Sequence, residues 1–407
     1  MPSAKSLFAH VLPFPGDPIL SLMEAFEQDP RPAKVSLSIG LYFDEAGRLP
    51  VLDSVRQAAQ ALAQAGGPCG YLPIEGIAAY RQLVQNLVFG DDHEAVRAQR
   101  IATVQTLGGS GALKVGADFI KHHFPDAEVW ISDPTWDNHL AILEGAGLRV
   151  QNYPYYDEVT GALRFDAMLQ TLQRLPSGSV VLLHASCHNP TGVDLSRAQW
   201  EALIPVIVDR GLIPFVDMAY QGFGDGLDED AWSVRALADA GAQALVANSF
   251  SKNFSLYGER VGGLSVVCND AATASRVLGQ LKAAVRRNYS SPPAQGARLV
   301  QQVLQSRELK EGWAEDLARM RERIKAMRAS LHEALHEHFG DRRDFRFLLT
   351  QRGMFSYTGI TEAQVNRLRD EHGVYLVRSG RMCMSGLSRA NVRYVADAII
   401  KVLGENQ

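Results

Sequence analysis

Seven short apolar runs lie between about residues 100 and 270, and segments with helical periodicity separate them. The runs are continuous rather than alternating, which is typical of strands covered on both faces. This order predicts an α/β protein with a mostly parallel, doubly wound sheet, whose ligands bind beyond the carboxyl ends of the strands. The predicted strands are Thr103–Leu107, Val129–Asp133, Leu148–Tyr153, Val180–Ala185, Ile213–Asp217, Leu245–Ser249 and Val261–Cys268.

The two ends of the chain follow other patterns. The first part, to about Arg48, has little periodicity, and we expect an extended arm followed by a short strand at Lys34–Ile39. Helical spacing returns at Val51–Ala65. An amphipathic pattern predicts a long connecting helix at Trp313–Phe339, leading to a smaller α+β unit. The expected division is an N-terminal arm with part of the small domain at 1–48, a large domain at 49–315 and the rest of the small domain at 316–407.

Composition excludes several classes of partner. The 407 residues carry 41 Lys+Arg and 45 Asp+Glu, a net charge of −4, without the basic surplus of a nucleic-acid binder. No run of about 18 apolar residues predicts a transmembrane helix, so we expect no membrane association. The four cysteines follow neither disulfide nor zinc-ligand spacing, which favours reduced thiols in a cytoplasmic protein.

Three predicted strands end in motifs open to two interpretations. Gly108–Gly111 precedes a helical run, where backbone N–H groups bind phosphate, but a tight turn explains these glycines equally well. Trp136 either stacks on a planar ligand or belongs to the core, and the motif alone favours the core. Asn189-Pro forces a turn that places a side-chain amide at the sheet edge. We expect His184 and His188 not to share a face, so we predict no metal site.

Two further strand ends carry reactive groups. Asp217 closes an apolar strand, where a carboxylate is costly to bury without a cationic or hydrogen-bonding partner, although a helix N-cap would also explain it. Tyr220 offers a phenol at the same edge. Lys252 follows the next strand between two phenylalanines, and desolvation lowers a lysine's pKa and frees its amine as a nucleophile.

A phosphate cradle is predicted beside this lysine. Ser249, Ser251 and Arg260 supply the hydroxyls and the guanidinium fork that hold a phosphate. The strand ends together therefore offer an amine nucleophile, a carboxylate, a phenol, an indole and a phosphate cradle. A cofactor with an aldehyde, a phosphate, a ring hydroxyl and a basic ring nitrogen would use each of them, which describes pyridoxal phosphate.

The chain resembles the fold-type I pyridoxal-phosphate aminotransferases, in particular the aspartate and aromatic amino acid subfamily and, within it, the bacterial aromatic (tyrosine) enzymes. The matching motifs run in family order over nearly the whole chain: GYLPIEG (70–76), GGSGA (108–112), DPTWDNH (133–139), HNPTG (188–192), DMAYQGF (217–223), NSFSKNFSLYGERVGG (248–263), VRRNYSSPPAQGA (285–297), QRGMFSYTG (351–359) and SGRMC (379–383).

The resemblance implies a role for each residue around the cofactor. Lys252 matches the lysine that forms the Schiff base and then carries the proton. Asp217 matches the carboxylate that keeps the pyridine nitrogen protonated, and His139 matches the imidazole that orients this carboxylate. Tyr220 and Asn189 match the groups that hydrogen-bond the ring oxygen. The remaining matches are Trp136, which stacks on the ring, and Gly109, Ser110, Ser249, Ser251 and Arg260, which form the phosphate cup. The peptide bonds Asp133-Pro134 and Asn189-Pro190 are both expected to be cis.

The resemblance also implies how substrates bind. Arg381 matches the bidentate clamp on the substrate α-carboxylate, assisted by Asn189, and Gly40 matches a backbone contact over the substrate. Tyr71 matches a phosphate contact and Arg286 a distal-carboxylate contact, both supplied by the partner subunit. These matches imply a homodimer with shared active sites.

Substrate preference rests on the residues near this entrance. Arg286 predicts use of the glutamate/2-oxoglutarate couple. Several neighbouring positions resemble the aromatic branch of the family: Leu41, Phe43, Leu49, Ser110 and Ser291. Their more apolar surface favours an aromatic substrate, because burying one ring contributes about 2–3 kcal/mol to binding. We therefore predict transamination between tyrosine, phenylalanine or aspartate and 2-oxoglutarate, giving the 2-oxo acid and glutamate.

Four alternatives differ from this prediction. The first is an aspartate aminotransferase with minor aromatic activity, and the second is a lyase or decarboxylase on the same fold. Two carboxylate-binding arginines, Arg381 and Arg286, favour transamination over the second. A nicotinamide-dependent dehydrogenase would need the G-x-G-x-x-G motif, which is missing. A non-catalytic binding module would not need every catalytic position filled.

Overall fold

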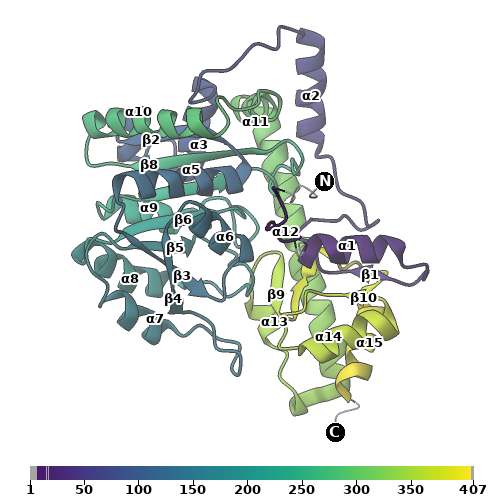
Figure 1. Ribbon diagram of the computed structural model, residues 1–407. Coiled ribbons are helices and arrows are strands. Elements are labelled where there is room, and N and C mark those ends of the chain that lie inside the picture. The colour runs from purple at the N-terminus through teal and green to yellow at the C-terminus, as the bar shows by residue number, and fades with distance from the viewer. Residues whose placement is uncertain (1–6, 15, 17, 405–407) are drawn as a thin grey trace, which may run out of the picture.

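The computed structural model describes residues 7–14, 16 and 18–404 (Figure 1). The beginning of the predicted arm, at residues 1–6, and the final three residues of the predicted small domain lie outside the described residues. Two bodies are visible in Figure 1, a large sheet-containing one and a smaller one in yellow, with the helix α12 running along both.

A seven-stranded sheet forms the centre of the large body, in the order β2-β8-β7-β6-β5-β3-β4. Only β8 runs against the other strands, so the sheet is mostly parallel, as the sequence predicts. Each predicted strand agrees with the observed one to within two residues, the largest difference being Thr103 against Ile101. The strands are β2 (Ile101–Leu107), β3 (Glu128–Asp133), β4 (Arg149–Pro154), β5 (Val180–His184), β6 (Ile213–Met218), β7 (Leu245–Ser249) and β8 (Val261–Val267).

Helices cover both faces of this sheet because its side chains alternate between two cores. On β5, Leu182 belongs to one hydrophobic cluster and Leu183 to the other. The first cluster is closed by α5 (Gly108–His123), α6 (Asp137–Gly145) and α10 (Ala271–Asn288). The second is closed by α3 (Ala78–Phe89), α4 (Glu94–Arg97), α7 (Phe165–Leu172), α8 (Arg197–Asp209), α9 (Trp232–Asp239) and α11 (Gln295–Gln305). At the edge, β4 is an exception to the expected two-sided burial, because Arg149, Gln151 and Asn152 are exposed.

The smaller body is built from both ends of the chain. The strand β1 (Val35–Ser36) pairs in parallel with β10 (Val374–Tyr375), so the predicted strand at 34–39 is present but short. The expectation of an extended arm before it is wrong in part, because α1 occupies Pro18–Gln28. The other elements are β9 (Phe355–Tyr357), β11 (Arg381–Cys383), α13 (Phe347–Thr350), α14 (Glu362–His372), α15 (Val392–Gly404) and the 3₁₀ turns η1 (Gly340–Arg342) and η2 (Met384–Gly386).

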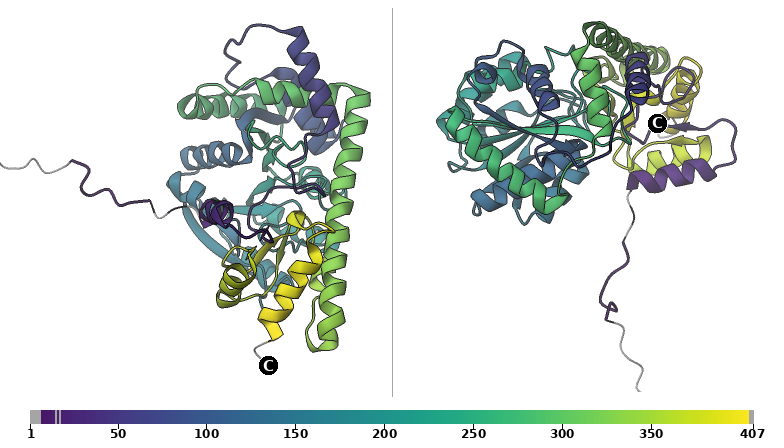
Figure 2. Two further views of the ribbon diagram at one scale, coloured as in Figure 1. Left: turned by 90° about the vertical axis from the view of Figure 1, so that its right-hand side faces the viewer. Right: turned by 90° about the horizontal axis from the view of Figure 1, so that it is seen from above.

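The long helix α12 (Arg307–Phe339) starts earlier than predicted and joins the two bodies. Figure 2 shows it lying along the side of the molecule, with α2 (Asp53–Ala65) and α11 near its first part. Ser306 caps its first turn through a hydrogen bond to the Leu309 N–H, which supplies an acceptor for a donor that the helix leaves unpaired. Its buried residues recur at helical spacing from Trp313 to Phe339, as the amphipathic pattern predicts.

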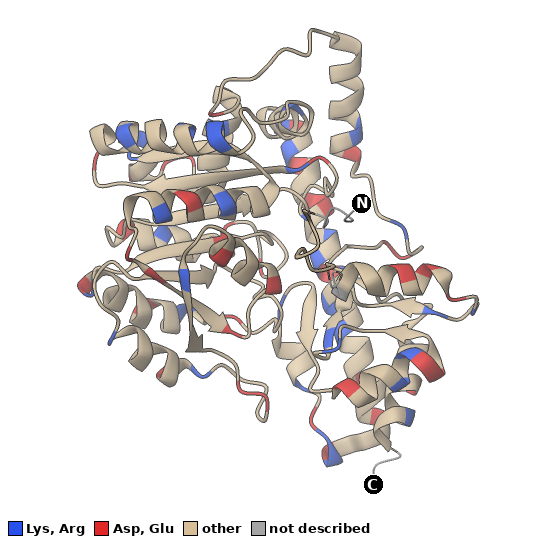
Figure 3. Ribbon diagram, in the orientation of Figure 1, with Lys and Arg blue, Asp and Glu red and all other residues tan. Residues whose placement is uncertain are grey.

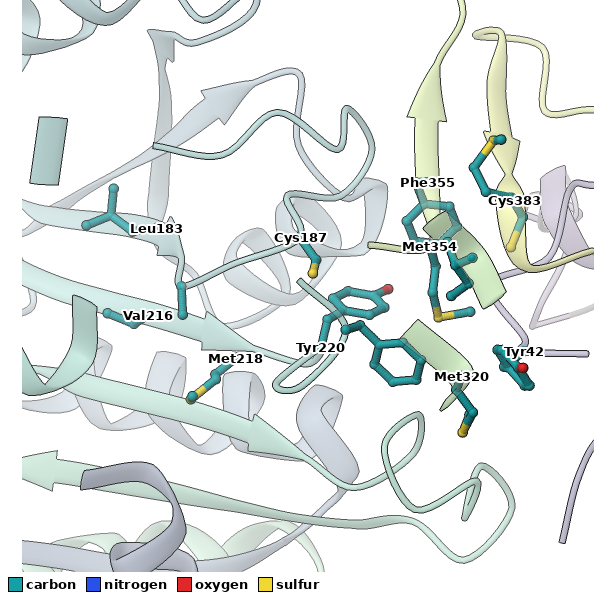
Figure 4. Close-up of a cluster of buried hydrophobic side chains, with 14 of the residues drawn as sticks. Tyr42, Leu183, Cys187, Val216, Met218, Tyr220, Met320, Met354, Phe355 and Cys383 are labelled. Atoms are coloured by element: carbon teal, nitrogen blue, oxygen red, sulfur yellow. The ribbon is translucent and has the colours of Figure 1, made fainter. Parts of the chain in front are cut away.

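One apolar core continues from the large body into the small one. In Figure 4, Leu183 and Val216 come from the sheet, Met320 from α12, and Phe355 and Cys383 from the small body. Charged side chains lie mainly on the helices and loops outside these cores (Figure 3). Across the described part of the chain, no helix is long and apolar enough to span a bilayer.

Candidate active site

Lys252 lies in the turn after β7, beside the carboxyl end of β6. Phe250 and Phe254 on either side are fully buried and fix the turn in the core. The Lys252 Nζ is 4.9 Å from the centre of the Tyr220 ring. Desolvation lowers the pKa of Lys252 to about 8, although the nearby Asp217 carboxylate opposes this effect. A substantial fraction of this amine is therefore neutral and nucleophilic near physiological pH.

Asp217, next to the end of β6, is the buried carboxylate that the sequence predicts to need a partner. Its partner is His139, whose Nε2 lies 2.9 Å from Asp217 Oδ2. The other ring nitrogen of His139 lies 2.8 Å from Thr135 Oγ1. Burial alone would raise the pKa of Asp217, but the hydrogen bond with His139 and nearby cationic groups bring it below its usual value. The carboxylate is therefore ionised and held in one orientation.

Two aromatic side chains border this pair. The phenol of Tyr220 is buried, and desolvation together with the Asp217 charge raises its pKa well above the usual value. The phenol is therefore protonated and able to donate a hydrogen bond. Trp136, which directly precedes α6, lies edge-on to His139 with ring centres 5.2 Å apart. The indole is half-buried.

The predicted phosphate cradle forms where β2, β7 and the start of α5 meet. Arg260 crosses Gly108 so closely that a Cβ on this glycine would lie 2.7 Å from Arg260 Nη2. The Arg260 Nη1 lies 3.5 Å from Ser251 Oγ, and a Cβ on Gly109 would lie 3.2 Å from Ser249 Cβ. The glycines expected before the helix form its first turn, where backbone N–H groups lack helical partners. A phosphate matches this set of donors.

A second guanidinium, that of Arg381, comes from β11 in the small body. Arg381 donates from Nη1 to Asn189 Oδ1 at 3.4 Å and from Nη2 to the Ser38 carbonyl at 2.7 Å. Its Cζ lies 4.5 Å from the centre of the Phe355 ring. Gly40 packs against the same ring, because a Cβ there would lie 2.9 Å from Phe355 Cζ. Asn189, Arg381 and Gly40 are thus brought together, as the sequence predicts.

Three predicted site residues, Tyr71, Arg286 and Ser110, are exposed or only half-buried in the single chain. The Tyr71 side chain is 98% exposed. Arg286, in the last turn of α10, is also exposed and hydrogen-bonds Ser290. Ser110 lies in the first turn of α5 and is half-buried. Among the described residues, Tyr71 and Arg286 make no hydrogen bond to the cluster around Lys252.

The histidine pair in the HNPTG region differs from the expectation. His184 and His188 were predicted not to share a face, yet their ring centres are 4.3 Å apart because the chain turns sharply at Cys187, with φ of 55°. Both nitrogens of His188 are engaged, by Ser132 and Thr191, at 2.9 and 2.8 Å. Ligand atoms of His139, His184 and Asp217 also lie within 4.8 Å of one another, but His139 has no ring nitrogen left for a metal ion. The prediction of no metal site stays a prediction.

Sequence reasoning missed two contributors to this geometry. Thr135 orients His139, and Phe355 covers the Arg381 guanidinium. Both lie inside motifs that the sequence analysis quotes, DPTWDNH and QRGMFSYTG. Their position in a motif was the available signal, but a hydroxyl or a ring in a loop does not by itself reveal its contact. The two X-Pro bonds at 133–134 and 189–190 are both cis, as expected.

The structure is that of a doubly wound α/β protein with a desolvated lysine amine at its strand ends. Comparison with known proteins identifies the family: the family described as "Aminotransferase class I and II" matches residues 32–399. The chain therefore belongs to the class I and II aminotransferases. The predicted family, fold class and enzyme class are confirmed, and the dehydrogenase alternative is excluded.

Relatives from several bacteria match over almost the whole chain. The aromatic-amino-acid aminotransferase of Escherichia coli (strain K12) is 58% identical over 98% of this chain and 100% of its own length. An aspartate aminotransferase of Pseudomonas aeruginosa is 50% identical over the same shares of both chains. The crystal structure of a Burkholderia pseudomallei aromatic-amino-acid aminotransferase, covalently bound to pyridoxal phosphate, has a TM-score of 0.96 and 52% identity, covering 98% of this chain and 100% of that one.

Proposed function

We propose that this protein transfers the amino group of tyrosine, phenylalanine or aspartate to 2-oxoglutarate, using pyridoxal phosphate. The observation that carries this function is Lys252, a desolvated amine with its pKa lowered to about 8, next to the ionised Asp217 and beside a phosphate-type cradle. The cofactor is also supported by the solved Burkholderia pseudomallei relative, which binds it covalently. When bound, pyridoxal phosphate supplies an aldehyde for amines and a ring that accepts electrons from the substrate α-carbon.

Lys252 has two roles in this proposal. Its neutral amine would hold the cofactor through the cofactor aldehyde. The same Nζ would then hold and move a proton as the general base and acid of the transamination. Both roles need the neutral amine, and the desolvation that lowers the pKa of Lys252 supplies it.

In this proposal the Asp217 carboxylate would pair with the ring nitrogen of the cofactor and favour its protonated form. A fixed negative charge in a buried site stabilises the positive ring without reorganisation during the reaction. The His139 imidazole holds the Asp217 carboxylate through a hydrogen bond, and the Thr135 hydroxyl holds the imidazole in turn. In this proposal Tyr220 and Asn189 would hydrogen-bond the ring oxygen, and Trp136 would stack on the ring.

In this proposal the phosphate cradle binds the cofactor phosphate, and the Arg381 guanidinium binds the substrate α-carboxylate. Gly109, Ser110, Ser249, Ser251 and Arg260 take the cofactor phosphate. Arg381, assisted by Asn189, takes the substrate α-carboxylate in the bidentate geometry that a guanidinium fork provides. The backbone at Gly40 passes over the substrate from the small body.

The active enzyme is a homodimer in this proposal. Tyr71 and Arg286 are exposed in the single chain, so a second subunit can use them. In the dimer, Tyr71 completes the phosphate site of the partner, and Arg286 receives the distal carboxylate of aspartate or glutamate there.

A second candidate is an aspartate aminotransferase with minor aromatic activity. It is favoured by Arg286 and by the 50% identity to an aspartate aminotransferase of Pseudomonas aeruginosa. The aromatic preference is favoured by the apolar entrance residues Leu41, Phe43 and Leu49, the last of which is 46% exposed and free to cover a ring.

One spectral experiment separates these candidates. The purified protein, loaded with pyridoxal phosphate, is titrated separately with phenylalanine and aspartate without a 2-oxo acid. Loss of the visible cofactor band to both donors, at lower phenylalanine concentration, is the expected result. Loss to aspartate alone moves the assignment to the second candidate. Absence of any band after loading contradicts the role of Lys252.

Two organisational proposals accompany the function. The domain division at 1–48, 49–315 and 316–407 places its last boundary inside α12, which makes this helix the connection between domains. A cytoplasmic location is supported by four cysteines that are all unpaired, three of them buried.

A further inference from the structure

The connecting helix α12 buries one arginine that has no role in the proposed function. The Arg328 residue is 3% exposed, in the stretch where α12 passes the small body. Burial lowers its pKa to about 10, and among the described residues no carboxylate forms an ion pair with it. A buried charge without a counter-ion is costly unless its donors make hydrogen bonds. The hydrogen bonds of the Arg328 guanidinium therefore decide whether its burial is tolerated.

The Arg328 guanidinium donates its hydrogen bonds to one short segment, residues 348–356. Nη1 donates to Ser356 Oγ at 2.5 Å and to the Leu348 carbonyl at 3.4 Å. Nη2 donates to the carbonyls of Phe355 at 2.5 Å and Gly353 at 2.9 Å. The same side chain also donates from Nη2 to the Arg352 carbonyl at 3.5 Å. Arg328 on the connecting helix therefore holds α13, the residues before β9 and the start of β9 through five separate acceptors.

The segment held in this way reaches the substrate side of the active site. The Phe355 ring lies 4.5 Å from Arg381 Cζ and makes an edge-to-face contact with Tyr220, with ring centres 5.9 Å apart. Figure 4 shows Phe355 and Tyr220 facing each other across the boundary between the two bodies. The same ring packs against Gly40. Displacing Phe355 would thus release the Arg381 guanidinium on one face.

We propose that Arg328 is a positioning residue for substrate binding: it holds Phe355 against Arg381, so that the Arg381 fork stays aligned with the substrate α-carboxylate. This inference rests on the proposed function, because it assigns the α-carboxylate to Arg381. Lysine cannot replace Arg328, since an ammonium is a compact donor and cannot span Ser356 and the Phe355 carbonyl as a planar fork does. The main effect is on carboxylate binding, because among the described residues neither Arg328 nor Phe355 hydrogen-bonds Lys252 or the phosphate cradle.

The test compares Arg328→Lys and Arg328→Met with the wild type, all loaded with pyridoxal phosphate. The probe is 3-phenylpropanoate, which has a carboxylate and a ring but no amine, and its binding is followed through the visible cofactor band. We expect its dissociation constant to rise about tenfold or more in Arg328→Lys, because small misplacements of a clamp are costly. The KM for phenylalanine rises with it, while cofactor affinity and Tm stay close to the wild type. Arg319→Lys, an exposed position on the same helix, is the matched control.

A double-mutant cycle checks the route through Phe355. Phe355→Leu removes the ring over Arg381, so Arg328→Lys adds little further loss of 3-phenylpropanoate binding in that background. Additive losses would place the effect of Arg328 elsewhere. If the Arg328 variants do not fold, Ser356→Ala removes one acceptor of the fork and gives the same selective loss on a smaller scale. Unchanged carboxylate binding in a folded variant, with the wild type active in transamination, overturns this inference alone; an inactive wild type overturns the proposed function.

Discussion

Two regions of the candidate site differ in how they are held. The strand-end cluster, which consists of Lys252, Asp217, His139 and Tyr220, is buried or half-buried and is assembled by one chain at the carboxyl ends of a parallel sheet. The exposed pair, Tyr71 and Arg286, lies on the surface with no contact to that cluster among the described residues. In the proposed function, the first region sets the chemistry, and the second adds the charge that recognises an acidic side chain.

This contrast explains why chemistry and specificity vary separately. The strand-end cluster is fixed by β6, β7 and α6, so a change there disturbs a hydrogen-bonded, desolvated group with no replacement. Arg286 sits at the end of α10, where its side chain can turn toward or away from a ligand without loss of core packing. Substitutions in the first region should therefore affect every substrate, and those in the second should discriminate between substrates.

The largest effect is expected for Lys252→Ala. Without the amine, neither covalent attachment of the cofactor nor proton transfer has its nucleophile and base, so multiple turnovers stop with phenylalanine and with aspartate. Steady-state assays with both donors measure this loss, and size-exclusion chromatography checks that the variant keeps the size of the wild type. Continued turnover without an added amine would contradict the assignment of Lys252.

Asp217→Asn comes next. An amide keeps the shape of the carboxylate but not its charge, so stabilisation of the protonated ring falls by about 3–4 kcal/mol, or about 10²–10³-fold in kcat. Phenylalanine and aspartate lose rate equally, because the ring nitrogen takes part in both reactions. A loss confined to one donor would show that Asp217 acts on substrate binding instead.

The sequence predicted the strand-end cluster well because its cause is local. A carboxylate that closes an apolar strand must find a partner, and Asp217 finds His139. A lysine between two phenylalanines must lose water, and the pKa of Lys252 falls. The seven strands were also predictable, since β-branched runs between helical patterns leave few other folds.

Other features were not predictable from the sequence. Phe355 meets the Arg381 guanidinium because β9 pairs with β11 in the small body, and the sequence pattern does not show which short strands pair. His184 meets His188, close by in the sequence, because Cys187 takes a left-handed conformation that its residue type does not signal. The helix α1 was missed because the Pro- and Gly-rich stretch around it conceals eleven helical residues.

Arg286→Ala tests the exposed pair and should separate the donors. Loss of a charge-assisted contact to the distal carboxylate costs about 2–3 kcal/mol for aspartate, while phenylalanine changes by less than about 1 kcal/mol. Values of kcat/KM for both donors measure the split. Equal losses would mean that Arg286 supports the fold or the dimer rather than specificity.

The same variant also tests whether the site is shared between subunits. In a mixed dimer of Lys252→Ala and Arg286→Ala chains, one of the two sites regains both an intact Lys252 and an intact Arg286. Random mixing of equal amounts should restore about a quarter of the wild-type aspartate activity. No recovery after verified subunit exchange would place Arg286 in the site of its own chain.

The smallest expected effect is the pH dependence of cofactor capture by Lys252. Since the pKa of Lys252 is lowered to about 8, its neutral fraction rises as pH increases toward that value and is complete above it. The rate at which the cofactor-free protein captures pyridoxal phosphate should rise about tenfold per pH unit below about pH 7.5 and level off above about pH 8.5. Stopped-flow absorbance measures it, with Lys252→Ala as the blank. A rate that keeps rising toward pH 10 would mean that Lys252 keeps the ordinary pKa of an exposed lysine, so that Asp217 outweighs desolvation in the free protein.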